Sequence, residues 1–541
     1  MGYMTELAEG DIERIVAALG QPLIEFICAS PVDELPHREG IAATIVRELN
    51  AVLSAEVEGK VDPAAMGEYL KHRMGEIING EVFALTLHKQ AGGVVDTPST
   101  STRLDELVVR LAADCYPLFL LPPDEFFRDI PGRINSQVTS ALFRHALAME
   151  FQDSVLADAK LGKIFKHHSE TSGYTTSMIY RNTGHGSSLQ LWTLLDIVLG
   201  GAWRSRPNAP TIPSVTEFCS LTLARWHLIR DVLSKESNQQ VHARFAFAGV
   251  RLPASEPYDF DDLILRQVDA RDDEYVPKNL SGQLTGTDAS GDSVVIDYSG
   301  DVVAETQMPY AIQYIDHGPD ELSVFPPELM NLNHIEELSR RLRISLLLAV
   351  SREHRVQIVP SWQYIDDPLQ HAATQGWSDP RQATGLMPTQ LTDREVVDWK
   401  DWYDLLSTPG SHRVDIALGR IIRAVAERRD PVDVLIDAVI AWENLFGSNQ
   451  GELKLRITAS MARLLAENPA ERLELRKKLG KIYDLRSQAV HGSGKPKPAE
   501  IALCYEALDY AIQVIKVVFK SRPDLLADKE GTDRSMRLLL E

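Results

Sequence analysis

The chain has 541 residues, which is too many for one compact core and predicts two to four domains. Apolar residues make up 44% of it and charged residues 25%, the balance of an ordinary soluble protein. A formal net charge of −21 argues against nucleic-acid binding by the surface as a whole, because phosphate contacts need local lysine and arginine.

The start of the chain is acidic where a secretion signal would be basic and then apolar, and no later stretch approaches 18 apolar residues. We therefore expect a cytoplasmic protein with no membrane contact. Four cysteines lie far apart and lack the spacing of metal ligands: Cys28, Cys115, Cys219 and Cys504. They predict buried thiols rather than a zinc site or disulfides, and no cofactor or metal is expected.

Residues 1–235 are predicted to be a mostly helical region. Apolar side chains recur at helical spacing from Ile12 to Leu19 and from Ile41 to Leu53, and the trend continues from Leu189 to Ile197. The pattern leaves open whether this region is one domain or two. We interpret it as a sensor or regulatory part.

Residues 236–408 are predicted to form an α+β middle domain with antiparallel strands. Strand composition covers Val241–Phe247 and Arg355–Trp362, and a hairpin is expected to join Val294–Tyr298 to Val302–Ala304. An intervening helix is expected from Leu332 to Val350.

A linker helix closes this middle domain. Thr392-Asp393-Arg394-Glu395 has the pattern of a capping box, and the amphipathic helix that follows is expected to run through Leu406. Thr408-Pro409-Gly410 then marks the best candidate for a domain boundary.

Residues 409–525 are predicted to form an all-α antiparallel helical bundle, with 526–541 as a C-terminal tail. Two of the helices begin with a cap residue followed by proline, at Asp430-Pro431 and Asn468-Pro469. The fourth helix is expected to reach Arg486, and a last one to cover Ala499–Phe519.

The bundle also holds the one strongly basic stretch of the chain. Eleven basic residues stand against five acidic ones between Gly451 and Lys497, and they surround an arginine and a histidine, Arg486 and His491. A histidine near neutral pKa can move protons, while an arginine can hold phosphate oxygens. Alternatives remain: a solvated basic face, or a histidine that stabilises a helix C-terminus.

Helix geometry constrains this pair. Five residues along a helix turn the side chain about 140° beyond a full turn, so Arg486 and His491 do not share a face of a regular helix. A symmetric dimer would bring two copies together in one cleft. Homodimerisation is therefore expected.

Four blocks of this region, in order, carry a family resemblance: Ala441-Trp442-Glu443-Asn444-Leu445-Phe446, Glu452-Leu453-Lys454-Leu455-Arg456-Ile457, Met461-Ala462-Arg463-Leu464-Leu465, and Ile482-Tyr483-Asp484-Leu485-Arg486-Ser487 with Val490-His491-Gly492. The segment from about 411 to 525 resembles the ApeA-like branch of HEPN domains. This resemblance implies a helical, dimeric, metal-independent endoribonuclease that acts as a toxin or as an anti-phage, abortive-infection effector, with Arg-x4–6-His at the dimer interface.

The resemblance also implies roles for single residues. His491 becomes the expected general acid/base and Arg486 the phosphate clamp, with Ser487 at a polar position and Tyr483 either lining the cleft or packing in the core. Glu443 is expected to make a structural hydrogen bond or salt bridge. The residues expected to contact RNA are basic: Lys478, Lys481 and Lys495.

The implied reaction is attack of a ribose 2′-hydroxyl on the adjacent phosphate, on tRNA, mRNA or rRNA. The larger N-terminal part would restrain the nuclease until a trigger, for instance a phage-encoded one, appears. The rival interpretation is a non-catalytic HEPN binding or dimerisation module in a regulatory or toxin–antitoxin complex.

Two further patterns favour plain structure over function. Arg181–Ser188 could cradle a phosphate, but it lacks the Lys-Ser/Thr of a P-loop and is predicted to be a turn before a helix. Asp269–Glu274 could attract a cation, but a solvated acidic loop is expected.

Overall fold

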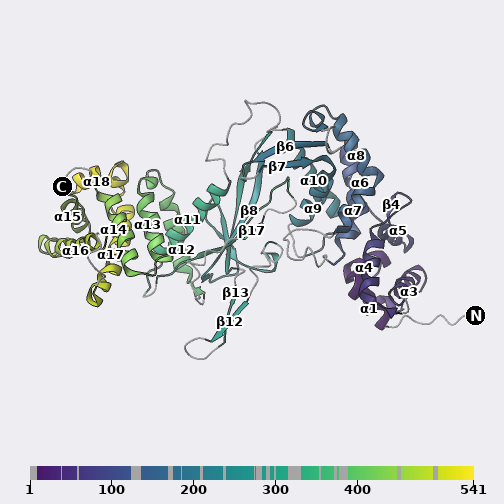
Figure 1. Ribbon diagram of the computed structural model, residues 1–541, viewed down its shortest axis with the longest axis horizontal. Coiled ribbons are helices and arrows are strands. Elements are labelled where there is room, and N and C mark those ends of the chain that lie inside the picture. Colours follow the sequence, from purple (N-terminus) through teal and green to yellow (C-terminus); the bar gives the residue numbers. More distant parts are fainter. Residues whose placement is uncertain are drawn as a thin grey trace, which may run out of the picture.

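The computed structural model describes residues 9–37, 39–57, 60–122, 136–167, 175–183, 186–206, 211–234, 239–272, 275, 283–287, 293–297, 300–314, 331–352, 355–370, 374–376, 388–447, 452–490 and 497–541. It is an elongated, mostly helical α+β fold, with N-terminal helices at one end, antiparallel sheets in the middle and a helical bundle at the other end (Figure 1). Across these ranges, no helix has the length and apolar character that crossing a bilayer requires.

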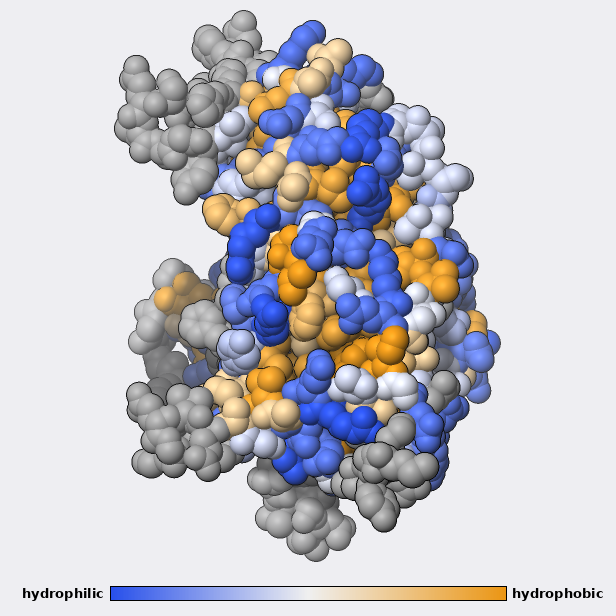
Figure 2. All heavy atoms as spheres, turned by 90° about the vertical axis from the view of Figure 1, so that its right-hand side faces the viewer, coloured by the Kyte–Doolittle hydropathy of each residue, from blue (hydrophilic) through white to orange (hydrophobic). Residues whose placement is uncertain are grey.

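Ten helices are described in the N-terminal region: α1 (Glu9–Leu19), α2 (Gln21–Cys28), α3 (Ile41–Leu53), α4 (Pro63–Met74), α5 (Phe83–Gln90), α6 (Arg103–Phe119), α7 (Ser136–Arg144), α8 (Ala146–Ala157), α9 (Leu194–Arg204) and α10 (Val215–Ser234). Helix α6 is buried along most of its length and contacts α5, α7, α8, α9 and α10. On the face that these helices turn outward, apolar and polar side chains are intermingled (Figure 2). All four cysteines are buried free thiols, as predicted.

The region also contains strands, in addition to the predicted helices. Two short hairpins pair β1 (Glu56–Val57) with β2 (Lys60–Val61) and β3 (Ile77–Ile78) with β4 (Glu81–Val82). A second sheet joins β5 (Lys166–His167), β6 (Thr175–Arg181) and β7 (Gly186–Gln190) to β15 (Ile312–Tyr314).

This second sheet corrects two predictions. Leu189 lies on β7 rather than on a helix, and the helix begins only at Leu194, because Ser177 of β6 pairs with Leu189 across the sheet. The Arg181–Ser188 stretch connects two strands rather than preceding a helix.

The main sheet has six antiparallel strands in the order β10-β11-β14-β8-β16-β17. Its strands are β8 (Gln239–Ala248), β10 (Tyr258–Asp259), β11 (Ile264–Gln267), β14 (Val302–Tyr310), β16 (Val359–Ile365) and β17 (Thr374–Gly376). The predicted strand at Val241–Phe247 is confirmed. The strand expected from Arg355 begins only at Val359, because pairing starts opposite Ala248, the last residue of β8.

The predicted hairpin between Val294–Tyr298 and Val302–Ala304 is wrong. Strand β13 (Ser293–Asp297) pairs with β12 (Gln283–Thr287), whereas β14 lies between β8 and β11. Both edges of β14 are therefore occupied. A further parallel pair joins β9 (Val250–Arg251) to β18 (Thr389–Gln390).

One apolar core runs through the N-terminal helices and the main sheet, from Ile12 to Tyr403, so a boundary near residue 235 does not separate two cores. Helices α11 (Asn331–Ala349) and α12 (Asp393–Leu406) face both this core and that of the bundle. The capping box that opens α12 is confirmed, since Thr392 and Glu395 each accept a hydrogen bond from the other's backbone N–H.

The bundle contains α13 (Asp415–Ala426), α14 (Pro431–Phe446), α15 (Leu453–Leu465), α16 (Pro469–Val490), α17 (Pro498–Lys520) and α18 (Gly531–Leu540). The five predicted helices are present. Residues 526–541, expected as a tail, include α18, which packs against α14 and α15. Its Arg534 is buried and donates to the carbonyls of Asn444, Leu445 and Asp528, so the tail belongs to the bundle.

Buried charges tie α10 to the ends of the main strands. Arg225 of α10 donates from both Nη atoms to Asp366, at 2.8 and 2.9 Å, and also to the carbonyl oxygen of Asp367. The Asp367 carboxylate accepts from Tyr310 of β14 and lies 3.5 Å from Arg181 of β6. The network holds the helices on the sheet.

Part of the predicted acidic loop joins a second set of buried charges. Asp272 is fully buried and accepts two hydrogen bonds of 2.7 Å from Arg266, whereas Asp269 pairs with Arg271. The expectation of a solvated loop is therefore wrong for Asp272, because its carboxylate is buried and paired with Arg266.

Candidate functional site: an arginine cluster and a basic groove

Helix α16 carries most of the predicted site residues. Its start follows the sequence signal, since the Asn468 side chain accepts a 2.9 Å hydrogen bond from the Glu471 backbone and Pro469 is the first helical residue. The helix continues to Val490, four residues beyond Arg486. Arg486 therefore lies within regular helix rather than at its end.

Glu443 of α14 gathers two of these residues. Tyr483 donates to Glu443 Oε1 at 2.8 Å, and Arg486 Nη2 lies 3.4 Å from Glu443 Oε2. Tyr483 and Arg486 are three residues apart, so both point toward α14 from the same side of α16. The structure thus brings Glu443, Tyr483 and Arg486 together; we call them the Glu443 cluster.

The cluster lies at the boundary between core and solvent. About a quarter of each side chain is exposed for Arg486 and Glu443, at 23% and 24%. The Nε atom of Arg486 is buried and has no hydrogen-bond acceptor among the described residues. This arginine therefore keeps donor capacity that its single long contact with Glu443 does not use.

Burial and the hydrogen bond to Glu443 raise the pKa of Tyr483 to about 12. At neutral pH its hydroxyl is therefore protonated and serves as a donor to the carboxylate. Tyr483 also packs against the apolar core of the bundle. It is a half-buried residue whose hydroxyl orients Glu443, and Glu443 in turn restrains Arg486.

The other predicted residues stand apart from this cluster. His491 and Lys495 lie outside the described residues. Ser487 is partly buried, and within the described part of the chain its side chain makes no hydrogen bond.

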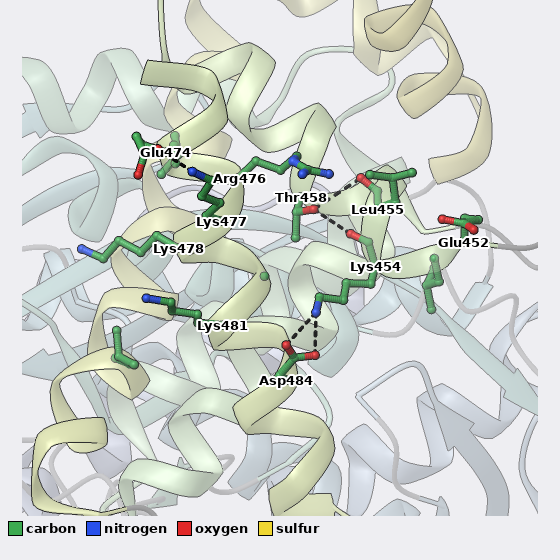
Figure 3. Close-up of a pocket in the computed structure, with 14 residues that line it drawn as sticks. Glu452, Lys454, Leu455, Thr458, Glu474, Arg476, Lys477, Lys478, Lys481 and Asp484 are labelled. Atoms are coloured by element: carbon green, nitrogen blue, oxygen red, sulfur yellow. Dashed lines mark hydrogen bonds and ion pairs between the residues drawn. The ribbon is translucent and has the colours of Figure 1, made fainter. Parts of the chain in front are cut away.

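A second feature of the bundle is a groove of about 1080 Å³ between α15 and α16 (Figure 3). Five basic and three acidic residues line it, which we call the lysine groove: Lys454, Arg476, Lys477, Lys478 and Lys481 with Glu452, Glu474 and Asp484. Gly480 lies in its floor, where a Cβ would stand 3.4 Å from Lys454 Cε. Lys454 crosses the groove to form an ion pair with Asp484 of α16, at 2.6 Å.

The two lysines predicted to contact RNA both line this groove but differ in their partners. Lys478 forms a 2.6 Å ion pair with Glu506 of α17, and that hydrogen bond raises its pKa. Arg476 and Lys481 form no salt bridge within the described residues, although the pKa of Glu474, lowered first by Lys477, is lowered further by the charge of Lys481. They are the cations most free to meet a phosphate.

Sequence reasoning counted Lys454 among the basic residues but did not place it opposite Asp484, thirty positions away. The sequence holds no local signal for this pair, because the two residues lie on different helices and meet only when α15 and α16 pack.

Lys481 of the lysine groove and Arg486 of the Glu443 cluster lie on different sides of α16, whereas Arg476 and Tyr483, seven residues apart, lie on nearly the same side. From Lys481 to Arg486 the helix turns about 140° beyond a full turn. A strand of RNA that contacted both Lys481 and Arg486 would have to pass around the helix. Within the described residues, no group of three or more His, Cys, Asp or Glu is placed to hold a metal ion.

Comparison with known proteins identifies no relative. No protein-family model matches the chain, and neither a curated protein nor a solved structure does. The HEPN resemblance of the bundle therefore stays a prediction, and the geometry described above has to support any function by itself.

Proposed function

We propose that the C-terminal bundle is a metal-independent endoribonuclease, serving as an anti-phage or toxin effector of the abortive-infection type. The observation that carries the proposal is the Glu443 cluster, which holds Arg486 at a solvent boundary with unused donors. An arginine with free donors is suited to binding phosphate. A histidine, His491, follows it five positions later in the sequence.

The proposed chemistry uses two side chains. His491 moves the proton of the ribose 2′-hydroxyl and protonates the leaving oxygen, while Arg486 stabilises the negative charge that develops on the phosphorane. The products are a 2′,3′-cyclic phosphate and a 5′-hydroxyl. DNA lacks the 2′-hydroxyl and resists this route. A homodimer through the bundle would place two copies of the pair in one cleft.

The lysine groove supports the same proposal as a contact surface for RNA phosphates. Arg476 and Lys481, which form no salt bridge within the described residues, are available for counterion-releasing contacts, which predicts salt-dependent binding. The groove is a local exception in a chain whose net charge is −21.

Residues 1–408 are proposed to restrain the nuclease until an infection-linked trigger, for instance a phage-encoded one, is present. Supporting contacts join the two parts: Arg355 to Asp509 at 2.6 Å, Ser351 to Lys516 at 3.0 Å, and Lys520 over the Trp402 ring at 4.7 Å. These contacts connect α17 to residues 351–402. A movement of that region would therefore shift α17 within the bundle.

A second candidate is a non-catalytic binding or dimerisation module. The same ion pair favours it, because an arginine held by Glu443 is also what a purely structural role requires. The two candidates differ in whether removal of Arg486 changes RNA integrity.

The test is RNA integrity in cells that express the full chain, its Arg486→Ala and His491→Ala variants, and Arg394→Ala as a control at equal expression, with and without phage challenge. Arg394 is 79% exposed and lies on α12, outside the bundle. We expect fragmentation by the full chain and the control and none by the other two. Intact RNA in every culture would favour the binding module.

A further inference from the structure

A pocket of about 470 Å³ lies where the main sheet, α11 and α13 meet. Its volume is in the range of small-molecule sites, roughly 300–1,000 Å³. Its lining residues come from β8, β16, α11 and α13, and none of them belongs to the Glu443 cluster or the lysine groove. We call it the sheet–bundle pocket.

One wall of this pocket is apolar and aromatic. Phe245 of β8 and Pro360 of β16 lie on the same face of the sheet, since Pro360 pairs with Phe247, and Ile422 of α13 is among the helical residues of the lining. Phe245 and Ile422 are buried and Pro360 is partly buried, so packing holds this surface in place. Such a surface suits the apolar or aromatic body of a ligand.

Three arginines and two glutamates, Glu336 and Glu427, line the polar side of the pocket. Arg340 and Arg343 lie three residues apart on α11, and Arg423 comes from α13. Arg340 lies 3.1 Å from Asp415, and Arg423 is 3.8 Å from Glu427, with the two arginines 37% and 46% exposed. Guanidinium groups from two helices at one site match the several oxygens of a phosphate.

Gly419 is a second, independent observation. It lies inside α13 and lines the pocket, yet a Cβ built on it would meet nothing within 4 Å. A glycine in a helix interior costs about 0.5–1 kcal/mol relative to alanine. Since no neighbour requires the missing side chain, its effect is to leave the pocket open.

We propose that the sheet–bundle pocket binds a nucleoside phosphate, with the nucleoside against Phe245 and Pro360 on the sheet and the phosphate at the arginines of α11 and α13. The ligand would touch both the sheet and the first long helix of the bundle. Its binding therefore stabilises their packing. Any effect on RNA cleavage rests on the proposed function and is a separate measurement.

The test uses the purified full chain without RNA, with AMP and ATP as probes and adenosine and inorganic phosphate as partial probes. Calorimetry and thermal unfolding should show binding of AMP or ATP, with each partial probe at least about tenfold weaker because it fills one half of the site. No binding of AMP or ATP at millimolar concentration overturns the proposal.

Variants locate the binding. Gly419→Leu fills the pocket and should abolish it, whereas the matched Gly419→Ala should retain it. Arg343→Gln and Arg423→Gln should weaken AMP binding more than adenosine binding, and Arg423 is exposed enough for its replacement to leave folding intact. Equal AMP affinity in the Arg423→Gln and unaltered chains, or in folded Gly419→Leu, would place the ligand elsewhere and refute the site. Because RNA is absent, this result is independent of the ribonuclease proposal.

Discussion

Two arginines, one under the main sheet and one in the bundle, show how differently the same ion-pair chemistry can be used. Arg225 is 5% exposed and engages Asp366 with both Nη atoms at 2.8 and 2.9 Å. Arg486 is 23% exposed and reaches Glu443 through one contact at 3.4 Å. The first arginine is committed to the fold, while the second retains donors for another partner.

The pKa of Arg225 agrees with its role in the fold. Burial by itself would lower the pKa of Arg225, but the charge of Asp366 and the hydrogen bonds to it outweigh that effect and raise it. A buried pair of this kind is strongly destabilising when one partner is removed, because the other charge is left in the core. An exposed pair has little effect on stability.

The largest expected effect therefore comes from Arg225→Gln. We expect the free energy of unfolding to fall by about 3–5 kcal/mol, because Asp366 loses its partner in the core. Urea denaturation of the full chain measures this against Arg394→Gln, whose 79% exposed arginine should change stability by less than about 0.5 kcal/mol. Similar stabilities for the two variants would show that the buried pair of Arg225 and Asp366 contributes no more to folding than an exposed arginine does.

Arg534→Met is expected to have an intermediate effect. This arginine is 1% exposed, and its neighbours at hydrogen-bond distance are backbone carbonyls, including those of Asn444 and Leu445 at the end of α14. Leaving these acceptors unpaired should cost about 1–3 kcal/mol.

The matched control for this change is Arg537→Met, on the same helix and 41% exposed. Thermal unfolding should separate the two variants by several degrees. If Arg537→Met proved as destabilising as Arg534→Met, α18 would be held by surface charge rather than by its buried arginine.

Arg486→Ala should change stability by less than about 1 kcal/mol, since its contact with Glu443 is long and partly exposed. Under the proposed function, the same change abolishes RNA cleavage. Denaturation and cleavage measured on one preparation test this separation of stability from activity. A loss of several kcal/mol would show that Arg486 is as structural as Arg225.

The smallest expected effect is a titration in the Glu443 cluster. The pKa of Tyr483 is raised from 10.0 to about 12, so the folded chain holds this proton more tightly than the unfolded chain does. Its contribution to stability is complete below pH 10 and is lost as the pH rises from 10 to about 12.

Glu443→Gln should lower the pKa of Tyr483 toward its ordinary value, because the charge that disfavours tyrosinate is removed while burial remains. Ultraviolet titration detects the tyrosinate, and subtracting the corresponding Tyr483→Phe chain in each background removes the other tyrosines. An unchanged pKa would mean that the hydrogen bond to Glu443 does not persist in solution.

Local signals made much of the bundle predictable. Thr392, Asp430 and Asn468 each cap the helix that their sequence context predicts, since a cap depends on residues two or three positions away. The Tyr483–Arg486 spacing similarly places both residues on one side of α16. The family resemblance led us to expect a hydrogen bond or salt bridge for Glu443, but only the structure identifies Tyr483 and Arg486 as its partners.

Strand partners were not predictable in the same way. Strand composition identified residues 294–298 and 302–304, but the short connection between them wrongly suggested a hairpin. Pairing depends on which distant edges are available, and β8 and β11 occupy both edges of β14. Helix α18 was not predicted for a related reason. It is held in the bundle by its packing against α14 and α15, which are tens of residues away in the sequence.

The sequence by itself determined five helices of the bundle, the caps of two of them and the basic character of the bundle, because hydrogen bonds and periodic apolar faces within a helix are short-range. Only the tertiary structure decided which arginines are enclosed and which stay available, and it alone placed Lys454 beside Asp484 and Gly419 beside the main sheet. Burial and electrostatic pairing are properties of neighbours in space. Residues far apart in the chain become such neighbours only when the elements pack.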